Sequence, residues 1–269
     1  MTTTALDPDA TLILRSPAVV PTTPLLVVLP PIAPVQPERI AFFDVPAAPF
    51  CLKVRAILLW KGLAFDAQEP PRPAAWTQAR KSGAGKVSAL AIGNRVITES
   101  ADIGTVLDRL YPARPLLPSG GRAAALCHAV TAWADESLDA VGLRYLWLEQ
   151  HDATTAQSTL AVLGRGPLGR AITNFCRLLS SDQGSAQTTG HRTPLQIEQD
   201  LRRHLAHASA LLADAPFVLG DEPWLCDFAL FGQLAFLLQE PASGERVQQH
   251  PRLLDYVKRV NALNELCAH

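Results

Sequence analysis

Hydrophobic and polar positions follow two different periods along the chain, and the change between them divides it into two parts. Between residues 40 and 111, short apolar runs of strand length stand beside helical patterns. Strands are predicted in "IAFFDV" from Ile40, in "AFDAQEP" from Ala64, and in the two halves of "ALAIGNRVITES". Those halves are separated by Gly93-Asn94, a strong signal for a tight turn between antiparallel strands.

Two amphipathic helices complete this first part. One begins at Pro49, a residue suited to the first helical position, and ends at Gly62. The other begins at Ser100 and ends before Pro112, with apolar residues at i, i+3, i+4 and i+7. The stretch "PPRPAAWTQARKSGAGK" (70–86) is predicted as a loop with one irregular helical turn. The predicted order is therefore β-α-β-(α)-β-β-α.

The second part shows helical patterns and no convincing strand. It follows "YPARPLLPSGGR" (111–122), a linker rich in proline and glycine. Long helices are predicted over 122–150 and 154–180, with a polar loop over 181–192 and a final helix in "PRLLDYVKRVNALNELC". The segment from Phe228 to Leu238 is apolar on all sides and too short to span a bilayer, so we expect a helix at the centre of a bundle.

One helix start in this part is marked by its sequence. Thr193-Pro194-Leu195-Gln196 fits a capping box with proline at the first helical position. The buried stripe behind it is predicted to consist of Leu201, Leu205, Ala208 and Leu212. The fold class is therefore α/β followed by all-α, with parts at 39–111 and 122–269.

Residues 1–38 differ from both parts. "SPAVVPTTPLLVVLPPIAPVQP" is apolar and uncharged, but its prolines argue against a membrane-spanning helix. The acidic Asp7 and Asp9 precede it, where a secretory signal would carry positive charge. We expect a flexible, proline-rich tail. It is either a dispensable extension or a docking or targeting segment.

Composition and charge narrow the range of partners. A formal net charge of -1 provides no basic field, so nucleic acid and anionic lipid surfaces are poor candidates. Five widely spaced cysteines lack metal-ligand spacing, which disfavours a metal site and indicates a reducing, cytoplasmic environment. They are Cys51, Cys127, Cys176, Cys226 and Cys267.

Four motifs in order carry a family resemblance. They are "APFCLKVRAILLWKGL", "KVSAL", the pair Glu99-Ser100, and "LGDEPWLCDFALFGQL". Over about 40–265 the chain resembles the cytosolic glutathione S-transferase superfamily of bacterial type. The resemblance implies a thioredoxin-like domain followed by an all-helical domain, glutathione as co-substrate or ligand, and a homodimer. The second substrate would be a small electrophile or a hydrophobic ligand.

The implied glutathione site comprises Phe50, Val87, Ser88, Glu99 and Ser100. The chemistry of the last two also stands on its own. A helix that begins at Ser100 offers backbone N–H groups and a positive dipole end to a carboxylate, while Glu99 can hold an ammonium group. A γ-glutamyl head carries both groups on one carbon. The alternative is that Ser100 only caps its helix.

Three positions depart from the family pattern. Ala48 stands where a serine or cysteine usually assists the thiol. Ser88 replaces a cis proline; a non-proline cis bond costs about 2.5 to 4 kcal/mol, so we expect a trans Val87-Ser88 bond and a displaced strand edge. Trp224 replaces a capping serine or threonine, leaving Asp227 to complement the helix start.

Cys51 is the candidate nucleophile that could replace the missing side chain. It lies about one helical turn beyond Ala48, where the dipole of the helix would still lower a thiol pKa. The same position usually faces inward, and a cysteine there is often a small buried hydrophobe. A reactive Cys51 would favour a thiol transferase or reductase over a conjugating enzyme.

Other polar and aromatic residues are weaker candidates. Asp135, Glu136 and Asp139 are predicted to form a solvated acidic face, in preference to a carboxylate pair. His204 and His207 fit a solvated helix face equally well. Trp133, Tyr145 and Trp147 are assigned to packing, or to an acceptor pocket. Two functions therefore stay open: a glutathione transferase, and a binding or assembly module of the same fold without turnover.

Overall fold

A computed structural model describes residues 39–44, 48–68, 89–93, 95–97, 100–149 and 192–267. Several predicted features lie outside these residues: the tail at 1–38, the irregular turn within 70–86, Val87, Ser88, Glu99, the helix at 154–180 and most of the loop at 181–192.

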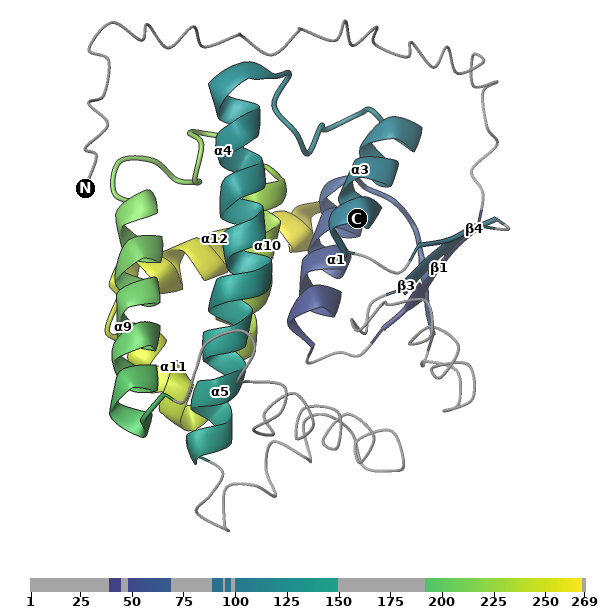
Figure 1. Ribbon diagram of the computed structural model, residues 1–269. Coiled ribbons are helices and arrows are strands. Elements are labelled where there is room, and N and C mark those ends of the chain that lie inside the picture. Colours follow the sequence, from purple (N-terminus) through teal and green to yellow (C-terminus); the bar gives the residue numbers. More distant parts are fainter. Residues whose placement is uncertain are drawn as a thin grey trace, which may run out of the picture. The chain divides into compact units, whose positions relative to one another are not determined.

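The first part contains a four-stranded mixed sheet with strand order β2-β1-β3-β4 (Figure 1). Its strands are β1 (Ile40–Phe43), β2 (Asp66–Gln68), β3 (Ala89–Ile92) and β4 (Arg95–Ile97). Strands β1 and β2 are parallel, so the chain must cross over between them, and α1 (Pro49–Trp60) forms that crossover. The pairs β1–β3 and β3–β4 are antiparallel, and the second agrees with the tight turn predicted at Gly93.

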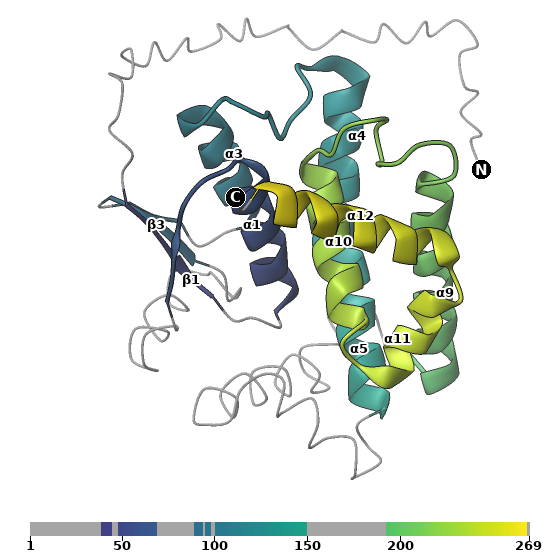
Figure 2. The same ribbon diagram turned by 180° about the vertical axis from the view of Figure 1, so that it is seen from behind.

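Two helices cover one face of this sheet. Helices α1 and α3 (Ser100–Leu110) lie on the same side in both views (Figures 1 and 2). The buried side chains of the strands alternate, as expected for a sheet covered on one face. They are Ile40, Phe42, Leu90 and Ile92.

In the second part, every regular element that the structure describes is a helix. They are α4 (Gly121–Ala132), the π-helical turn η1 (Trp133–Leu138), α5 (Asp139–Glu149), α9 (Pro194–Leu211), α10 (Leu225–Leu237), α11 (Pro241–Gln248) and α12 (Pro251–Cys267). The predicted α/β part followed by an all-helical part is confirmed. Two details were not predicted: the π-turn, which joins α4 to α5, and the short polar helix α11.

Local sequence rules hold for α9 and α10. The Thr193 hydroxyl accepts the Gln196 N–H at 3.3 Å, and the Gln196 side chain accepts the Thr193 N–H at 2.8 Å, which confirms the capping box. All four residues of the predicted α9 stripe are buried. Every residue of α10 except Ala235 is buried, so α10 is the central helix that its apolar sequence predicts.

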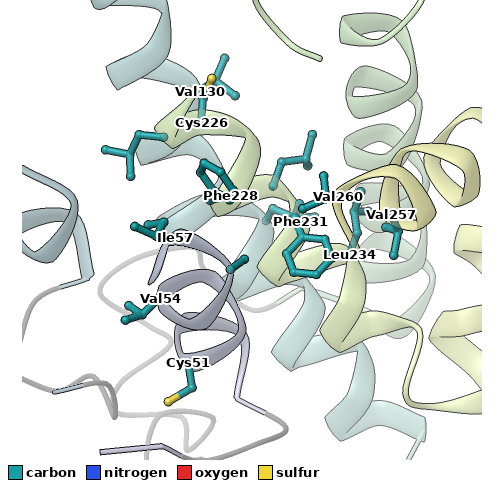
Figure 3. Packing of buried hydrophobic residues seen from close by; sticks show 14 of the residues in the cluster. Cys51, Val54, Ile57, Val130, Cys226, Phe228, Phe231, Leu234, Val257 and Val260 are labelled. Carbon is teal, nitrogen blue, oxygen red and sulfur yellow. The ribbon is translucent and has the colours of Figure 1, made fainter. Parts of the chain in front are cut away.

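One hydrophobic core joins the two parts. Figure 3 shows Ile57 of α1 beside Phe228 of α10, and Val257 and Val260 of α12 on the other side of α10. Cys51 and Val54 belong to the same buried cluster and lie on the side of α1 that faces away from α10. Helix α1 thus lies between the sheet and α10 (Figure 2).

The linker between the parts is fixed by a buried lysine at the end of α1. The Lys61 ammonium donates to Asp108 Oδ1 at 2.6 Å and to the carbonyl oxygens of Tyr111 at 2.9 Å and Arg114 at 3.1 Å. The Asp108 carboxylate also accepts the backbone N–H of Leu116 at 2.8 Å. Because these bonds hold successive linker residues, the linker has a defined path.

The start of α10 is held by Asp227 rather than by its first residue. The Trp224 side chain offers no acceptor, whereas the Asp227 carboxylate accepts the backbone N–H groups of Trp224 and Val218, each at 2.9 Å. The Tyr256 hydroxyl donates to the Asp227 carbonyl oxygen at 2.7 Å. The prediction that Asp227 compensates for Trp224 is confirmed.

Asp227 is expected to make stability depend on pH. Burial raises the pKa of Asp227 to about 6, although the hydrogen bonds from Trp224 and Val218 oppose this. The folded state therefore binds the proton more tightly than the unfolded state. The contribution of Asp227 to the free energy of unfolding is therefore greatest below about pH 4. It decreases as the pH rises to about 6 and is constant above that, a total change of up to about 3 kcal/mol.

Urea unfolding between pH 4 and 7 measures this dependence. The stability of the wild type minus that of Asp227→Asn should decrease across the interval, because the variant lacks the titrating group. Asp255→Asn is the matched control, since the side chain of Asp255 is 67% exposed. A wild-type minus Asp227→Asn difference that does not change with pH would contradict the prediction.

Candidate functional site

The predicted thiol site lies at the N-terminus of α1, directly after β1. Ala48 has an extended backbone, and its carbonyl oxygen accepts the Leu52 N–H at 2.9 Å, so it is the N-cap residue. Pro49 takes the first helical position, as predicted. The Ala48 methyl group cannot cap the helix or donate to a thiolate. Any activation at this site therefore depends on the helix end or on another side chain.

The two residues after Pro49 point inward. Phe50 is 8% exposed and Cys51 is fully buried. The Cys51 thiol lies 4.0 Å from the carbonyl oxygen of Phe43, at the end of β1. Figure 3 shows Cys51 at the start of the helical face that continues with Val54 and Ile57. This burial favours Cys51 as a packing residue over Cys51 as a nucleophile.

Helix α10 approaches the first turn of α1 very closely. A Cβ atom at Gly232 would lie 2.5 Å from the carbonyl oxygen of Pro49 and 3.2 Å from the backbone nitrogen of Lys53. No side chain fits in that space, so the backbones of the two helices are in contact there. The position of the α1 N-terminus is therefore set by the helical part as well as by the sheet.

A buried ion pair holds the same turn from a second direction. The Lys53 ammonium lies 2.6 Å from Asp135 Oδ2, and the two side chains are 1% and 5% exposed. The prediction that Asp135 belongs to a solvated acidic face was wrong, whereas Glu136 is exposed as expected. Helical spacing from the buried residues Cys127 and Thr131 could have indicated an inward position for Asp135.

The predicted head-group site is described only in part. Helix α3 begins at Ser100, as predicted, and its Ile103 and Leu107 are buried against the core. Glu99, Val87, Ser88 and the side chain of Ser100 lie outside the described residues. The helix start needed for carboxylate binding is therefore present, and the recognition pair stays a prediction.

A groove lies between α4 and α9, away from α1. It has a volume of about 470 Å³ and is lined by Ala129, Val130, Trp133, His207, Ala210 and Leu211. At its side the Trp133 indole N–H donates to His204 Nδ1 at 2.9 Å, and the two rings stack. His204 is thus half-buried, whereas His207 is exposed, as a solvated helix face implies. Burial, followed by the charge of Arg203, lowers the pKa of His204.

Among the described residues, no cluster of three or more His, Cys, Asp or Glu side chains could hold a metal ion. Within the same residues, no helix is long and apolar enough to cross a bilayer.

Solved structures that share this fold include the following three. The beta-etherase LigF from Sphingobium sp. strain SYK-6 is 19% identical with a TM-score of 0.57, covering 85% of this chain and 98% of that chain. FzlA from C. crescentus is 18% identical with a TM-score of 0.59, covering 86% and 90%. A glutathione S-transferase from Methylobacterium radiotolerans JCM 2831, in complex with glutathione sulfonate, is 22% identical with a TM-score of 0.57, covering 83% and 91%.

Family comparisons match both parts of the chain. Residues 42–115 match the glutathione S-transferase N-terminal domain, and residues 201–260 match the glutathione S-transferase C-terminal domain. No curated protein matches the chain. The N-terminal match covers the sheet with α1 and α3, and the C-terminal match covers the helices around α10. Their order along the chain is therefore that of the two parts of the fold. The chain therefore belongs to the glutathione S-transferase superfamily.

Proposed function

We propose that this protein is a glutathione transferase that binds glutathione between the N-termini of α1 and α3. The observation that carries the proposal is the pair of helix starts, at Pro49 and at Ser100, in a chain of this superfamily. Glu99 would hold the γ-glutamyl ammonium group, and Ser100 with the first N–H groups of α3 would hold its carboxylate. Val87, Ser88 and Phe50 would line the cysteinyl portion.

The reaction would be thiol conjugation. The bound thiol loses its proton to solvent, and the positive end of α1 favours the resulting thiolate. The sulfur electron pair forms a bond to an electrophilic carbon, and the leaving group departs with the electrons of the bond that breaks. The acceptor would be a small electrophile or a hydrophobic molecule. Because Ala48 offers no hydrogen bond, we expect slow turnover.

Ala48 and Cys51 also bear on two alternative functions. A binding or assembly module would keep glutathione binding without turnover, and the methyl group of Ala48 favours it. A thiol transferase using Cys51 would need that sulfur to reach a disulfide, and the full burial of Cys51 disfavours it. In each case we propose a cytoplasmic homodimer. Sedimentation would separate it from the 29.0 kDa monomer.

Calorimetry with glutathione and a conjugation assay with chlorodinitrobenzene test the function together. Binding at millimolar glutathione with measurable conjugation supports the transferase. Binding without conjugation of this or other electrophiles supports the module. The absence of binding would reject both. Glu99→Gln, which removes the proposed ammonium ligand, should weaken binding about tenfold, whereas Glu136→Gln on the exposed side of η1 should not.

Ala48→Ser is expected to raise the conjugation rate about tenfold or more, because a hydroxyl at the N-cap can donate to the thiolate, and an interaction of about 1.4 kcal/mol corresponds to that factor. The rate is measured at saturating glutathione across pH. Cys51→Ser is the comparison and should leave the rate unchanged. A loss of activity in Cys51→Ser, with no gain in Ala48→Ser, would instead identify Cys51 as the nucleophile.

A further inference from the structure

The buried pair Lys53–Asp135 has no part in the proposed reaction, yet it contacts the helix whose N-terminus would activate the thiol. We propose that Lys53 and Asp135 are positioning residues that hold the N-terminus of α1 in the orientation needed for thiolate formation. This inference rests on the proposed function. Lys53 and Asp135 would thus determine the thiol pKa although neither is a predicted glutathione contact.

The burial of the pair points to a role in geometry rather than in stability. Both side chains are at most 5% exposed, and their charged atoms are 2.6 Å apart. Removing two charges from water costs about as much as the pair regains, and well-packed apolar residues often stabilise a core better. The second oxygen of Asp135 is also buried and accepts no hydrogen bond from the described residues. Because desolvation and the unbonded oxygen offset the stability that the pair provides, we infer that its role is to hold α1 in one position.

Two contacts on the same turn define that position. The backbone at Gly232 meets Pro49 and Lys53 from α10, and Asp135 meets the Lys53 ammonium from η1. A close backbone contact limits how near α1 can come to α10. A short ion pair at the end of a long side chain limits rotation of α1 about its own axis. Together the contacts fix the direction of the N–H groups beside Ala48.

Asp135 lies within the π-turn η1. Helices α4 and α5 continue through η1, where an extra residue in the turn changes the register of the side chains. Within this turn Trp133 faces His204 of α9, while Asp135 faces Lys53 of α1. Such turns occur frequently at functional sites. Here Trp133 and Asp135, two positions apart on this turn, contact α9 and the first part of the chain.

The test must separate positioning from folding. Lys53→Met alone leaves a buried carboxylate and is expected to destabilise the protein, so it cannot decide. The double variant Lys53→Met/Asp135→Leu replaces the pair by apolar side chains and should regain the wild-type urea midpoint. Lys53→Gln/Asp135→Asn keeps a neutral hydrogen bond and serves if the apolar pair does not fold. Arg39→Met/Asp66→Leu is the control, because that ion pair is exposed.

The decisive readout is the thiol pKa of bound glutathione, followed by thiolate absorbance as a function of pH. In the apolar double variant we expect this pKa to rise by about one unit, and the conjugation rate at neutral pH to fall about tenfold and recover at higher pH. The control should match the wild type. Folded double variants with wild-type thiol pKa would overturn the inference. A wild type that binds no glutathione would instead reject the proposed function itself.

Discussion

Lys61→Met is expected to lower the free energy of unfolding by about 3 to 5 kcal/mol, because it removes one member of a buried ion pair. The Lys61 side chain is fully buried, and its ammonium group serves Asp108 and three carbonyl oxygens of the linker. Methionine has a similar length, so packing of the stem is retained. The loss therefore reports the polar contacts of the ammonium group.

Urea or thermal unfolding of the full chain measures the effect. Lys258→Met is the matched control: the Lys258 side chain is 77% exposed and its ion pair with Asp255 is long, at 3.8 Å. Exposed pairs of this kind contribute about 0 to 1 kcal/mol. If Lys61→Met cost no more than this control, the buried network at the linker would not stabilise the fold.

Gly232→Ala is expected to destabilise the protein by about 3 kcal/mol, although alanine normally favours a helix by about 1 kcal/mol over glycine. The added methyl group would lie 2.5 Å from the carbonyl oxygen of Pro49, and backbone atoms cannot turn aside as a side chain can. Helices α1 and α10 would have to separate. The N-terminus of α1, where the thiol site is proposed, would move with them.

Gly244→Ala in α11 provides the comparison. Its added methyl group would come no closer than 3.4 Å to the Leu238 carbonyl oxygen, which is ordinary contact. We expect Gly244→Ala to be neutral or stabilising, so the two alanine variants should differ by about 4 kcal/mol in unfolding free energy. Equal stabilities would mean that the helices can separate at little cost.

The helices that were predicted correctly from the sequence are those whose ends are determined by residues adjacent in the chain. Pro49, Ser100 and Thr193 mark helix starts through local backbone chemistry, and each helix begins where they predict. The central position of α10 follows from its uninterrupted apolar sequence. Helix α11 was not predicted, because "PASGERVQ" is short and polar and forms a helix only within this packing.

The site was predictable to a smaller extent, since its geometry depends on residues far apart in sequence. Asp135 has the composition of a surface residue, and only a partner 82 positions away makes its burial tolerable. The π-turn could not be predicted, because the helical pattern of apolar residues, with its period of 3.6, does not distinguish it from a continuous α-helix. In contrast, the inward orientation that the sequence suggested for Cys51 agrees with the full burial of this residue.

The core shared by α1 and α10 also limits how this sequence can diverge. Val54 and Ile57 belong to the segment matched to the N-terminal domain, and Phe228 to the segment matched to the C-terminal domain. A volume change on one of these helices must be accommodated by the other. The two domains are therefore expected to accumulate substitutions in pairs, and exchanging one domain with that of a distant relative would disturb the contact that positions the N-terminus of α1.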